Sequence, residues 1–158
     1  KPVEEPKMEV YTYDYAVEKY KLALVSAMAK KAKLSEKAYI CLNIAWLYRG
    51  QVEELNAAET KDEAKIKECQ GQEEAFYQQA FEGFMKAVST EDFPMCGMDS
   101  CTVDYLLATM AYHYKKFDVS SKCIARIQAA PSASKKMKDR AFDLKEKIVT
   151  EIKNGKQA

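Results

Sequence analysis

Apolar residues recur at steps of three and four along most of the chain, which is the spacing of amphipathic helices. The first such segment runs from Tyr13 to about Lys31. A second begins near Ser35, its predicted N-cap, and is apolar on nearly every side. The pattern therefore predicts that this second helix is enclosed by neighbours on several sides.

A polar stretch follows at residues 50–74, where apolar residues become sparse while Glu, Lys, Ala and Gln still favour helix. The pattern predicts two helical arms joined by a turn near residues 57–60. Thr60 and Glu63 are expected to form a capping box at the start of the second arm. This arm regains an apolar face around Phe84, so we expect a long hairpin that partly projects from the domain.

Capping and helix-breaking residues divide the rest of the chain into three further helices. Asp99 is the predicted N-cap of a fourth helix that reaches about residue 115. A fifth helix spans about 118–128 and stops at a proline. The sixth begins after Ser132 or Ser134 and ends at Asn154. The sequence thus predicts an all-α fold of about six helices.

A pattern of small, large and small residues, with steps of four and three, recurs in three of these helices. Small residues let two helices approach closely, while the large residue fills the groove between them. The three sets are Ala16, Tyr20 and Ala23; Ala80, Phe84 and Ala87; and Ser120, Ile124 and Ile127. In the third, the pattern has an aliphatic residue at its last position.

The region before the third set resembles a tetratricopeptide (TPR) repeat. The matching positions are Leu107, Ala108, Ala111 and Phe117. This resemblance implies antiparallel helical hairpins stacked in a short right-handed solenoid. We expect an extended lead-in at 1–11, the TPR-like helical domain at 12–154 with its polar extension at about 50–74, and a tail at 155–158.

The TPR resemblance also implies a binding groove, because the first helix of each hairpin lines a concave surface in such proteins. The groove residues would be Lys37, Ile40, Ile44, Leu47 and Tyr48, followed by Thr102, Tyr105, Thr109, Tyr112 and His113. Rigid tyrosines on an apolar surface suit a peptide or helix from a partner protein. Alternatively, these residues are core, covered by the opening helix, by an upstream segment or by a second copy of the chain.

Charge is balanced overall, with 25 basic and 24 acidic residues, but it is unevenly distributed. Residues 51–92 hold four basic and eleven acidic residues, a net charge of −7, and residues 115–158 hold twelve basic and five acidic residues, a net charge of +7. The two regions could attract each other or a partner. Basic and acidic residues alternate in the last third as on a solvated helix, which does not favour nucleic acid as the partner.

Residues suited to catalysis or metal binding are scarce. His113 is the only histidine, and the sequence has no Gly-rich phosphate loop, nucleophile elbow or paired metal-binding histidines. Cys96, Cys101, His113 and Cys123 could formally supply four zinc ligands, but their spacing matches no paired-cysteine site. We therefore expect no enzymatic activity, no cofactor and no metal.

The five cysteines are odd in number and scattered along the chain. This usage favours free thiols in a reducing cytoplasm over a disulfide framework. The chain has no stretch of 18 apolar residues and no signal sequence, so we do not expect a membrane association.

Three short stretches resemble an uncharacterised bacterial family known only as a domain of unknown function. They are 19–24 (KYKLAL), 45–49 (AWLYR) and 93–99 (FPMCGMD), followed by Tyr105 and Leu106. Members of that family carry an N-terminal segment with paired cysteines of zinc-ribbon type, whereas the first cysteine here is Cys41. The resemblance implies a TPR-like module without an established activity. A metal-linked or enzymatic role would reside in a missing upstream segment.

Overall fold

The computed structural model describes residues 12–157, and this part of the chain is built from α-helices. The helices are α1 (Tyr13–Ala29), α2 (Leu34–Ala57), α3 (Glu63–Thr90), α4 (Ser100–His113), α5 (Phe117–Ala129) and α6 (Lys135–Gln157). The expected all-α fold of six helices is confirmed for these residues. The expected lead-in at 1–11 lies outside them. None of the described helices has the length and apolar character needed to cross a lipid bilayer.

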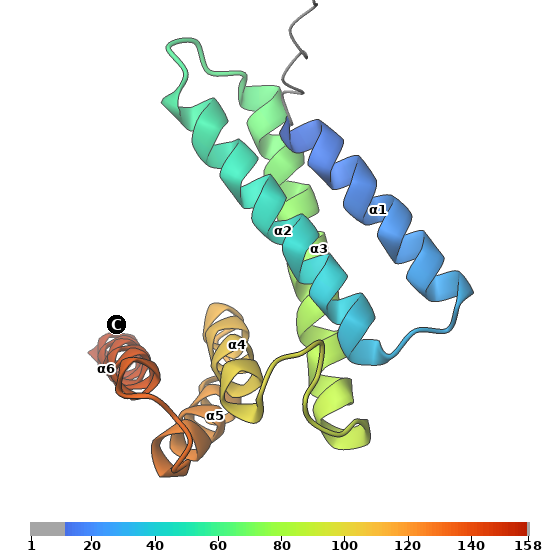
Figure 1. Ribbon diagram of the computed structural model, residues 1–158. Coiled ribbons are helices and arrows are strands. Elements are labelled where there is room, and N and C mark those ends of the chain that lie inside the picture. The colour runs from blue at the N-terminus through green and yellow to red at the C-terminus, as the bar shows by residue number, and fades with distance from the viewer. Residues whose placement is uncertain (1–11, 158) are drawn as a thin grey trace, which may run out of the picture.

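The helices form two groups that meet at one end of a long hairpin (Figure 1). Helices α2 and α3 form this hairpin, and α1 runs alongside it. At 24 and 28 residues, α2 and α3 are about 36 and 42 Å long at 1.5 Å per residue. Helices α4, α5 and α6 lie across the end of the hairpin where α2 begins and α3 ends. The predicted turn is present, and the hairpin tip projects beyond the second group.

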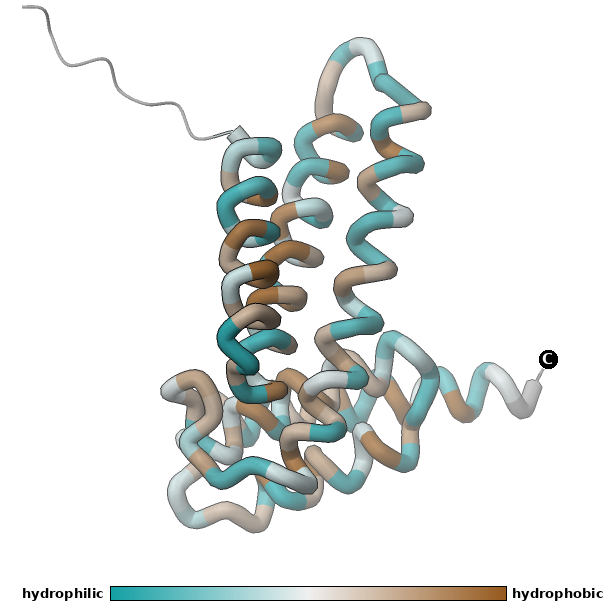
Figure 2. Tube along the Cα trace, turned by 90° about the vertical axis from the view of Figure 1, so that its right-hand side faces the viewer, coloured by the Kyte–Doolittle hydropathy of each residue, from teal (hydrophilic) through white to brown (hydrophobic). Residues whose placement is uncertain are grey.

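Helix α1 is held against the hairpin by a small core cluster. Its buried residues are Val17, Ile44, Tyr48 and Cys69, from α1, α2 and α3. Tyr13 also lies so close to Gly50 that a Cβ atom at that glycine would be 2.7 Å from the tyrosine hydroxyl. Hydrophobic residues recur where α1 and α2 face each other in Figure 2, whereas the hairpin tip is mainly hydrophilic. The polar extension is therefore partly packed, and only its tip projects.

The main core joins the hairpin to the second group of helices. Its largest fully buried side chains include Phe84 of α3, Leu42 of α2, Leu107 and Met110 of α4, and Ile124 of α5. Helices α2 and α3 approach closely at Gly83, where an added Cβ atom would be 2.8 Å from the Cβ of Ala38. Burial of this apolar surface is the main force that holds the two groups together.

Two of the three small–large–small sets are buried in this core. Ala80, Phe84 and Ala87 of α3 and Ser120, Ile124 and Ile127 of α5 all have almost no exposed surface. The set in α1 is not buried, because Tyr20 and Ala23 are exposed. Helix α1 packs instead through Val17 and Ala27. The pattern therefore predicted close helix packing correctly in α3 and α5 and wrongly in α1.

Two predicted N-caps are replaced by other residues. Ser35 lies inside α2, and both its backbone N–H and its hydroxyl donate hydrogen bonds to the carboxylate of Glu91, at the end of α3. Glu91 therefore satisfies the start of α2 from across the hairpin. At the start of α3, Asp62 rather than Thr60 is the cap, because its carboxylate accepts a hydrogen bond from the Lys65 N–H at 3.1 Å.

The last helix begins as expected and ends later than expected. The Ser134 hydroxyl accepts a hydrogen bond from the Met137 N–H at 3.1 Å, in agreement with one of the two predicted starts. Helix α6 continues through Asn154 and Gly155 to Gln157, so residues 155–157 are helical and not a separate tail. The polar composition of these residues permits helix even though Gly155 weakens it.

The loop between α3 and α4 makes a tight turn that leads into the predicted cap. Met95 and Met98 exchange backbone hydrogen bonds of 3.0 and 2.8 Å, and Cys96 and Gly97 between them have φ values of 54° and 74°. Asp99 then caps α4, because its carboxylate accepts a hydrogen bond from the Thr102 N–H at 2.8 Å. The predicted N-cap is confirmed.

Replacing Asp99 with Ala is expected to lower the free energy of unfolding by about 1 kcal/mol at pH 7. The Thr102 hydrogen bond lowers the pKa of Asp99 below its usual 3.8. A lowered pKa in the folded state stabilises the protein above pH 3.8, and this contribution disappears as the pH falls through the folded value. Urea denaturation from pH 7 to 3 should therefore show a difference between the two proteins that shrinks in acid. Asp92→Ala, which removes an exposed loop carboxylate, is the control; an equal loss in that variant would contradict the cap.

Candidate functional site

The groove residues predicted on α2 lie against α1 and α3 of the same chain. Ile44 is fully buried and Tyr48 is nearly so, while Ile40 and Leu47 are half-buried around them. Tyr48 stacks on Phe76 of α3, with ring centroids 6.3 Å apart. This corrects the expectation for Ile44 and Tyr48, which are core residues because α1 covers them. For these two residues, the alternative that the opening helix covers them applies.

The groove residues predicted on α4 have partners within the second group of helices. Thr109 donates its hydroxyl hydrogen bond to the Tyr105 carbonyl at 2.9 Å. Tyr112 donates its hydroxyl hydrogen bond to Glu151 of α6, also at 2.9 Å, and this bond raises the pKa of Tyr112. Thr102 lies in the first turn, where its N–H is bound to the cap. Tyr105 and Tyr112 are only half-buried, so part of each ring reaches solvent.

His113 links the end of α4 to the hairpin. Its Nε2 atom is 3.0 Å from Oε2 of Glu74 on α3. Its ring lies edge-on to Tyr77 and Tyr114, with centroid separations of 5.0 and 4.8 Å. Burial and the nearby Glu74 raise the pKa of Tyr114. These contacts place His113 in a connection between the two helix groups.

The two predicted sets do not form one continuous surface. Within residues 12–157, no Cα atom of α2 lies within 8 Å of a Cα atom of α4. The hairpin meets the second group instead through α3, which contacts α4. Lys37 belongs to a different hollow, on the side of the hairpin that faces the end of α1.

That hollow is a cavity of about 760 Å³ bounded by α1, α2, α3 and the start of α5. Most of its walls are apolar. They include Leu24 and Met28 of α1, Leu34 and Ala38 of α2, and Phe81 and Met85 of α3. The cavity lies beside the second half of α1, where Leu24 and Met28 line it. Of the predicted groove residues, Lys37 alone lines it.

Three of the polar residues of the cavity are lysines. Lys37, Lys86 and Lys116 line it, from α2, from α3 and from the residue that precedes α5. The Nζ atom of Lys116 lies 5.3 Å from the centroid of the Phe81 ring, within cation–π range. Glu82 is the acidic residue of the lining, and it accepts a hydrogen bond from Gln78 at 3.3 Å. The cavity thus combines an apolar interior with positive charge.

The cavity also contains the thiol of Cys41. Burial raises the pKa of Cys41, so the thiol stays protonated at neutral pH. Its Sγ atom lies 3.8 Å from Oε1 of Gln79. A protonated thiol without a nearby base is a poor nucleophile, so Cys41 contributes to the wall of the cavity and does not suit covalent chemistry.

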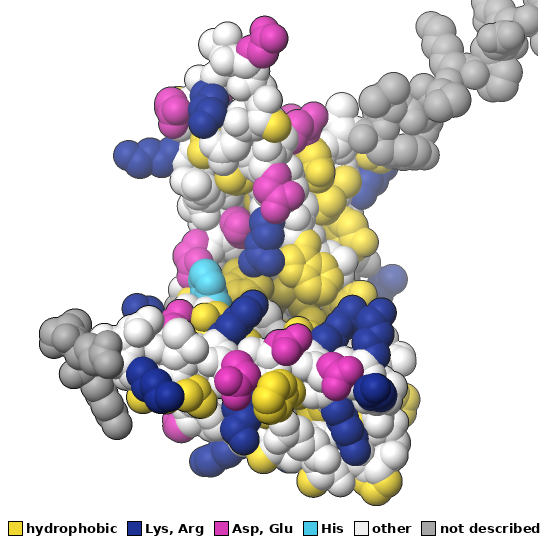
Figure 3. Space-filling view, turned by 90° about the vertical axis from the view of Figure 1, so that its left-hand side faces the viewer, with side chains coloured by type: hydrophobic (Ala, Val, Ile, Leu, Met, Phe, Trp, Pro, Cys, Tyr) yellow, Lys and Arg dark blue, Asp and Glu magenta, His cyan; other side chains and the backbone are white. Residues whose placement is uncertain are grey.

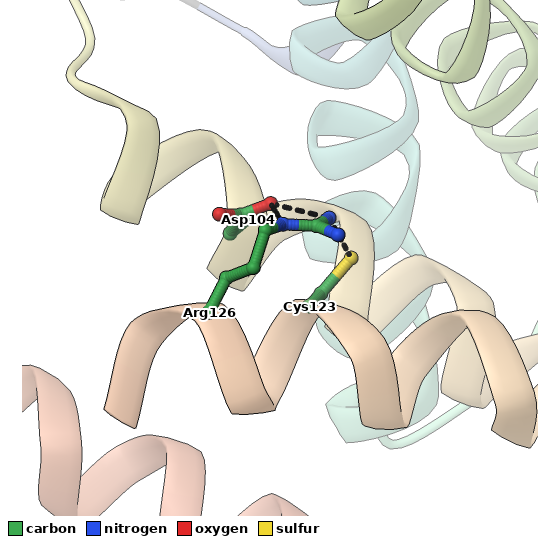
Figure 4. Close-up of polar contacts among 3 residues, drawn as sticks. All are labelled: Asp104, Cys123 and Arg126. Carbon is green, nitrogen blue, oxygen red and sulfur yellow. Dashed lines mark hydrogen bonds and ion pairs between the residues drawn. The ribbon is translucent and has the colours of Figure 1, made fainter. Parts of the chain in front are cut away.

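A second, smaller cavity of about 340 Å³ lies between the α3–α4 loop, α4 and α5, beside the ion pair of Asp104 and Arg126. Nε and Nη2 of Arg126 donate hydrogen bonds to Oδ1 of Asp104 at 3.1 and 2.8 Å (Figure 4). Nη2 also lies 3.2 Å from Sγ of Cys123. The Asp104 side chain is 10% exposed and that of Arg126 is 52% exposed. The pair therefore ties α4 to α5 and leaves one face of the guanidinium in solvent.

The cysteines considered as zinc ligands are free thiols. Burial raises the pKa of Cys123 to about 11, and burial also raises the pKa of Cys96. Across residues 12–157 the structure has no group of three or more His, Cys, Asp and Glu side chains placed to hold a metal ion. His113 lies against Glu74 on α3, and Cys123 lies against Arg126.

Charged side chains of both signs cover the second group of helices. In Figure 3, Lys and Arg alternate with Asp and Glu across its outer face, and hydrophobic side chains gather above it, on the face of the hairpin seen in that view. On the face seen in that view, this mixture is typical of a solvated helix and does not form a basic patch. The charges there are of both signs, whereas the cavity combines three lysines with one acidic residue.

The cavity could not be found from the sequence. Its walls come from segments up to 95 residues apart, from Leu24 to Val119. Apolar residues at helical spacing show which face of a helix is buried, but they do not show where two neighbouring helices diverge. The nearest signal was the half of α1 after Val17, where Leu24 and Met28 continue the apolar pattern.

A model of a known family matches most of the chain. The family is described as "Uncharacterized protein conserved in bacteria (DUF2225)", and the match covers residues 4–148. The search of curated proteins and the search of solved structures each found no match. The family description names no activity, ligand or partner, so the function has to be inferred from the geometry of the cavity.

Proposed function

Because the chain belongs to this family of uncharacterised bacterial proteins, DUF2225, we propose its function from the geometry. The protein is a non-catalytic interaction module that binds a peptide or helix of a partner protein. The binding site is the cavity bounded by α1, α2, α3 and α5, and its apolar interior is the observation that carries the proposal.

The size and lining of the cavity suit a protein segment. Its volume of about 760 Å³ lies within the range of sites that enclose a ligand. Burying apolar surface stabilises a complex by about 25 cal/mol per Å² before the entropic costs of association. Met28 and Met85 at the edge can change rotamer to fit different apolar side chains. A row of such side chains on one face of a helix would fill the hollow.

We propose that the module is TPR-like and cytoplasmic. The order of its helices supports the description as TPR-like: an opening helix is followed by the pairs α2–α3 and α4–α5 and by a final α6. The five free cysteines, four of them buried, support a cytoplasmic location, since thiols persist in a reducing compartment. Tyr105 and Tyr112 of α4, which are half-buried, remain a second predicted contact surface for the same partner.

Replacing Met28 with Glu is expected to abolish partner binding, because an apolar contact at the edge of the cavity is replaced by a charge that the bound segment would have to desolvate. Val25→Glu is the matched control: Met28 and Val25 are 63% and 64% exposed on the same helix, but only Met28 lines the cavity. Proteins captured from a bacterial lysate by each purified variant would be compared by mass spectrometry. A specific partner should be retained by the wild type and by Val25→Glu and lost with Met28→Glu.

Met28→Glu and Val25→Glu also distinguish partner binding from a second candidate function, structural self-association. Leu22 and Val25 are more than half exposed on the side of α1 away from the hairpin, which favours a partner surface there. Light scattering of a self-associating chain would show a dimer that Val25→Glu dissociates. A partner that Met28→Glu still captures, or a loss that follows Val25→Glu instead, would contradict the cavity as the binding site.

A further inference from the structure

Three lysines surround the cavity without acidic partners. Lys37, Lys86 and Lys116 form no ion pair with any residue between 12 and 157. They come from three separate elements, and all line the same hollow. Glu82 is the one acidic side chain in the described lining, so the lining carries a net charge of +2. The positive charge of the lining therefore complements a negatively charged partner.

The positions of the lysines relative to the apolar walls restrict that partner. Lys116 lies over the Phe81 ring, so a bound carboxylate would approach it beside an apolar side chain. Lys37 and Lys86 line the cavity together with Ala38 and Gly83, where α2 and α3 pack closely against each other. The lining therefore offers apolar and ionic contacts to the same ligand.

Resting on the proposed function, we infer that the bound segment is an acidic amphipathic helix. Its apolar face fills the cavity, and its carboxylates lie against Lys37, Lys86 and Lys116. Carboxylates at the rim of an interface raise the rate of association and select against basic partners. A nucleic-acid backbone would neutralise the lysines but would leave the apolar walls uncovered, and a flat bilayer surface could not enter the hollow.

Three labelled synthetic peptides test this inference. All carry the same row of leucines at helical spacing, and the flanking positions are Glu in the first, Gln in the second and Lys in the third. We expect the Glu peptide to bind the full chain at least about tenfold more tightly than the Gln peptide in fluorescence anisotropy, and the Lys peptide to bind most weakly. Raising the salt concentration should reduce the advantage of the Glu peptide, because salt screens charges near the surface.

Charge-neutral variants assign the effect to the cavity. Replacing Lys37, Lys86 and Lys116 with Gln should remove the preference for the Glu peptide. The matched control replaces Lys136, Lys145 and Lys147 of α6 with Gln, which removes the same charge outside the cavity, and it should keep the preference. Circular dichroism checks that both variants are folded, as expected for exposed or half-exposed side chains.

Results other than a preference for the Glu peptide would each overturn a specific part of the proposal. Equal binding of the Glu and Gln peptides, with both lost in Met28→Glu, would overturn the acidic partner and leave the cavity as a binding site. A preference that disappears only in the α6 variant would place the acidic contact on that helix. Tighter binding of a DNA duplex than of the Glu peptide would identify a nucleic-acid site. Failure of all three peptides to bind would count against the proposed function itself.

Discussion

Replacing Phe84 with Ala is expected to lower the free energy of unfolding by about 3–5 kcal/mol, which is the usual cost of deleting a fully buried aromatic ring. Phe84 has no exposed surface, and it lies in the main core together with residues of α2, α4 and α5. The cavity left by the ring cannot collapse easily, because Ala80 and Ala87 already bring their helix close to its neighbours.

Urea denaturation followed by circular dichroism measures this loss, and the melting temperature should fall by roughly 10 °C for a domain of this size. Phe142→Ala on α6 is the control, because the same side chain is removed from an exposed position. It should change the free energy of unfolding by less than about 0.5 kcal/mol. Similar losses in the two variants would show that Phe84 is not at the centre of the core.

Replacing Arg126 with Met is expected to have the second largest effect, a loss of about 2–3 kcal/mol at pH 7. The substitution leaves the nearly buried Asp104 carboxylate without its partner, and an unpaired buried charge is costly. Asp104→Asn should cost less, because the guanidinium that it leaves is half exposed and keeps its contact with water. The size of the loss therefore depends on which partner is removed.

A double variant separates this explanation from a loss of packing. The double variant with Asp104→Leu and Arg126→Met should be more stable than Arg126→Met alone, because no charge remains buried. If the losses measured for Asp104→Leu alone and for Arg126→Met alone simply add in the double variant, the ion pair does not explain them.

The sequence was sufficient for the helices and for the caps Asp99 and Ser134, but it favoured Thr60 over Asp62, whose partner is also only three residues away. The carboxylate of Asp99 binds an N–H three residues later, so the local pattern was enough to identify this cap. Ser35 resembled a cap equally well, but its hydrogen bonds go to Glu91, which is 56 residues away. A single sequence does not show such a contact, because it depends on how the two ends of the hairpin meet.

The candidate site was less predictable than the helices. Ile44 and Tyr48 have the spacing of a groove face, yet α1 covers them, and periodicity alone does not distinguish a covered face from an open one. The position of the cavity depends on how α1 packs on the hairpin, through Val17, Ala27 and the contact of Tyr13 with Gly50. Lys37 lines this cavity and not the groove for which it was predicted, and its expected neighbours lie elsewhere.

The contact between Ser35 and Glu91 also determines how the hairpin can come apart. The carboxylate of Glu91, at the end of α3, accepts two hydrogen bonds from Ser35, at the beginning of α2, so fraying at either residue breaks both bonds. We therefore expect the two helix ends to open together. The α3–α4 loop begins at this point, so such opening would also release the tether that joins the two groups of helices.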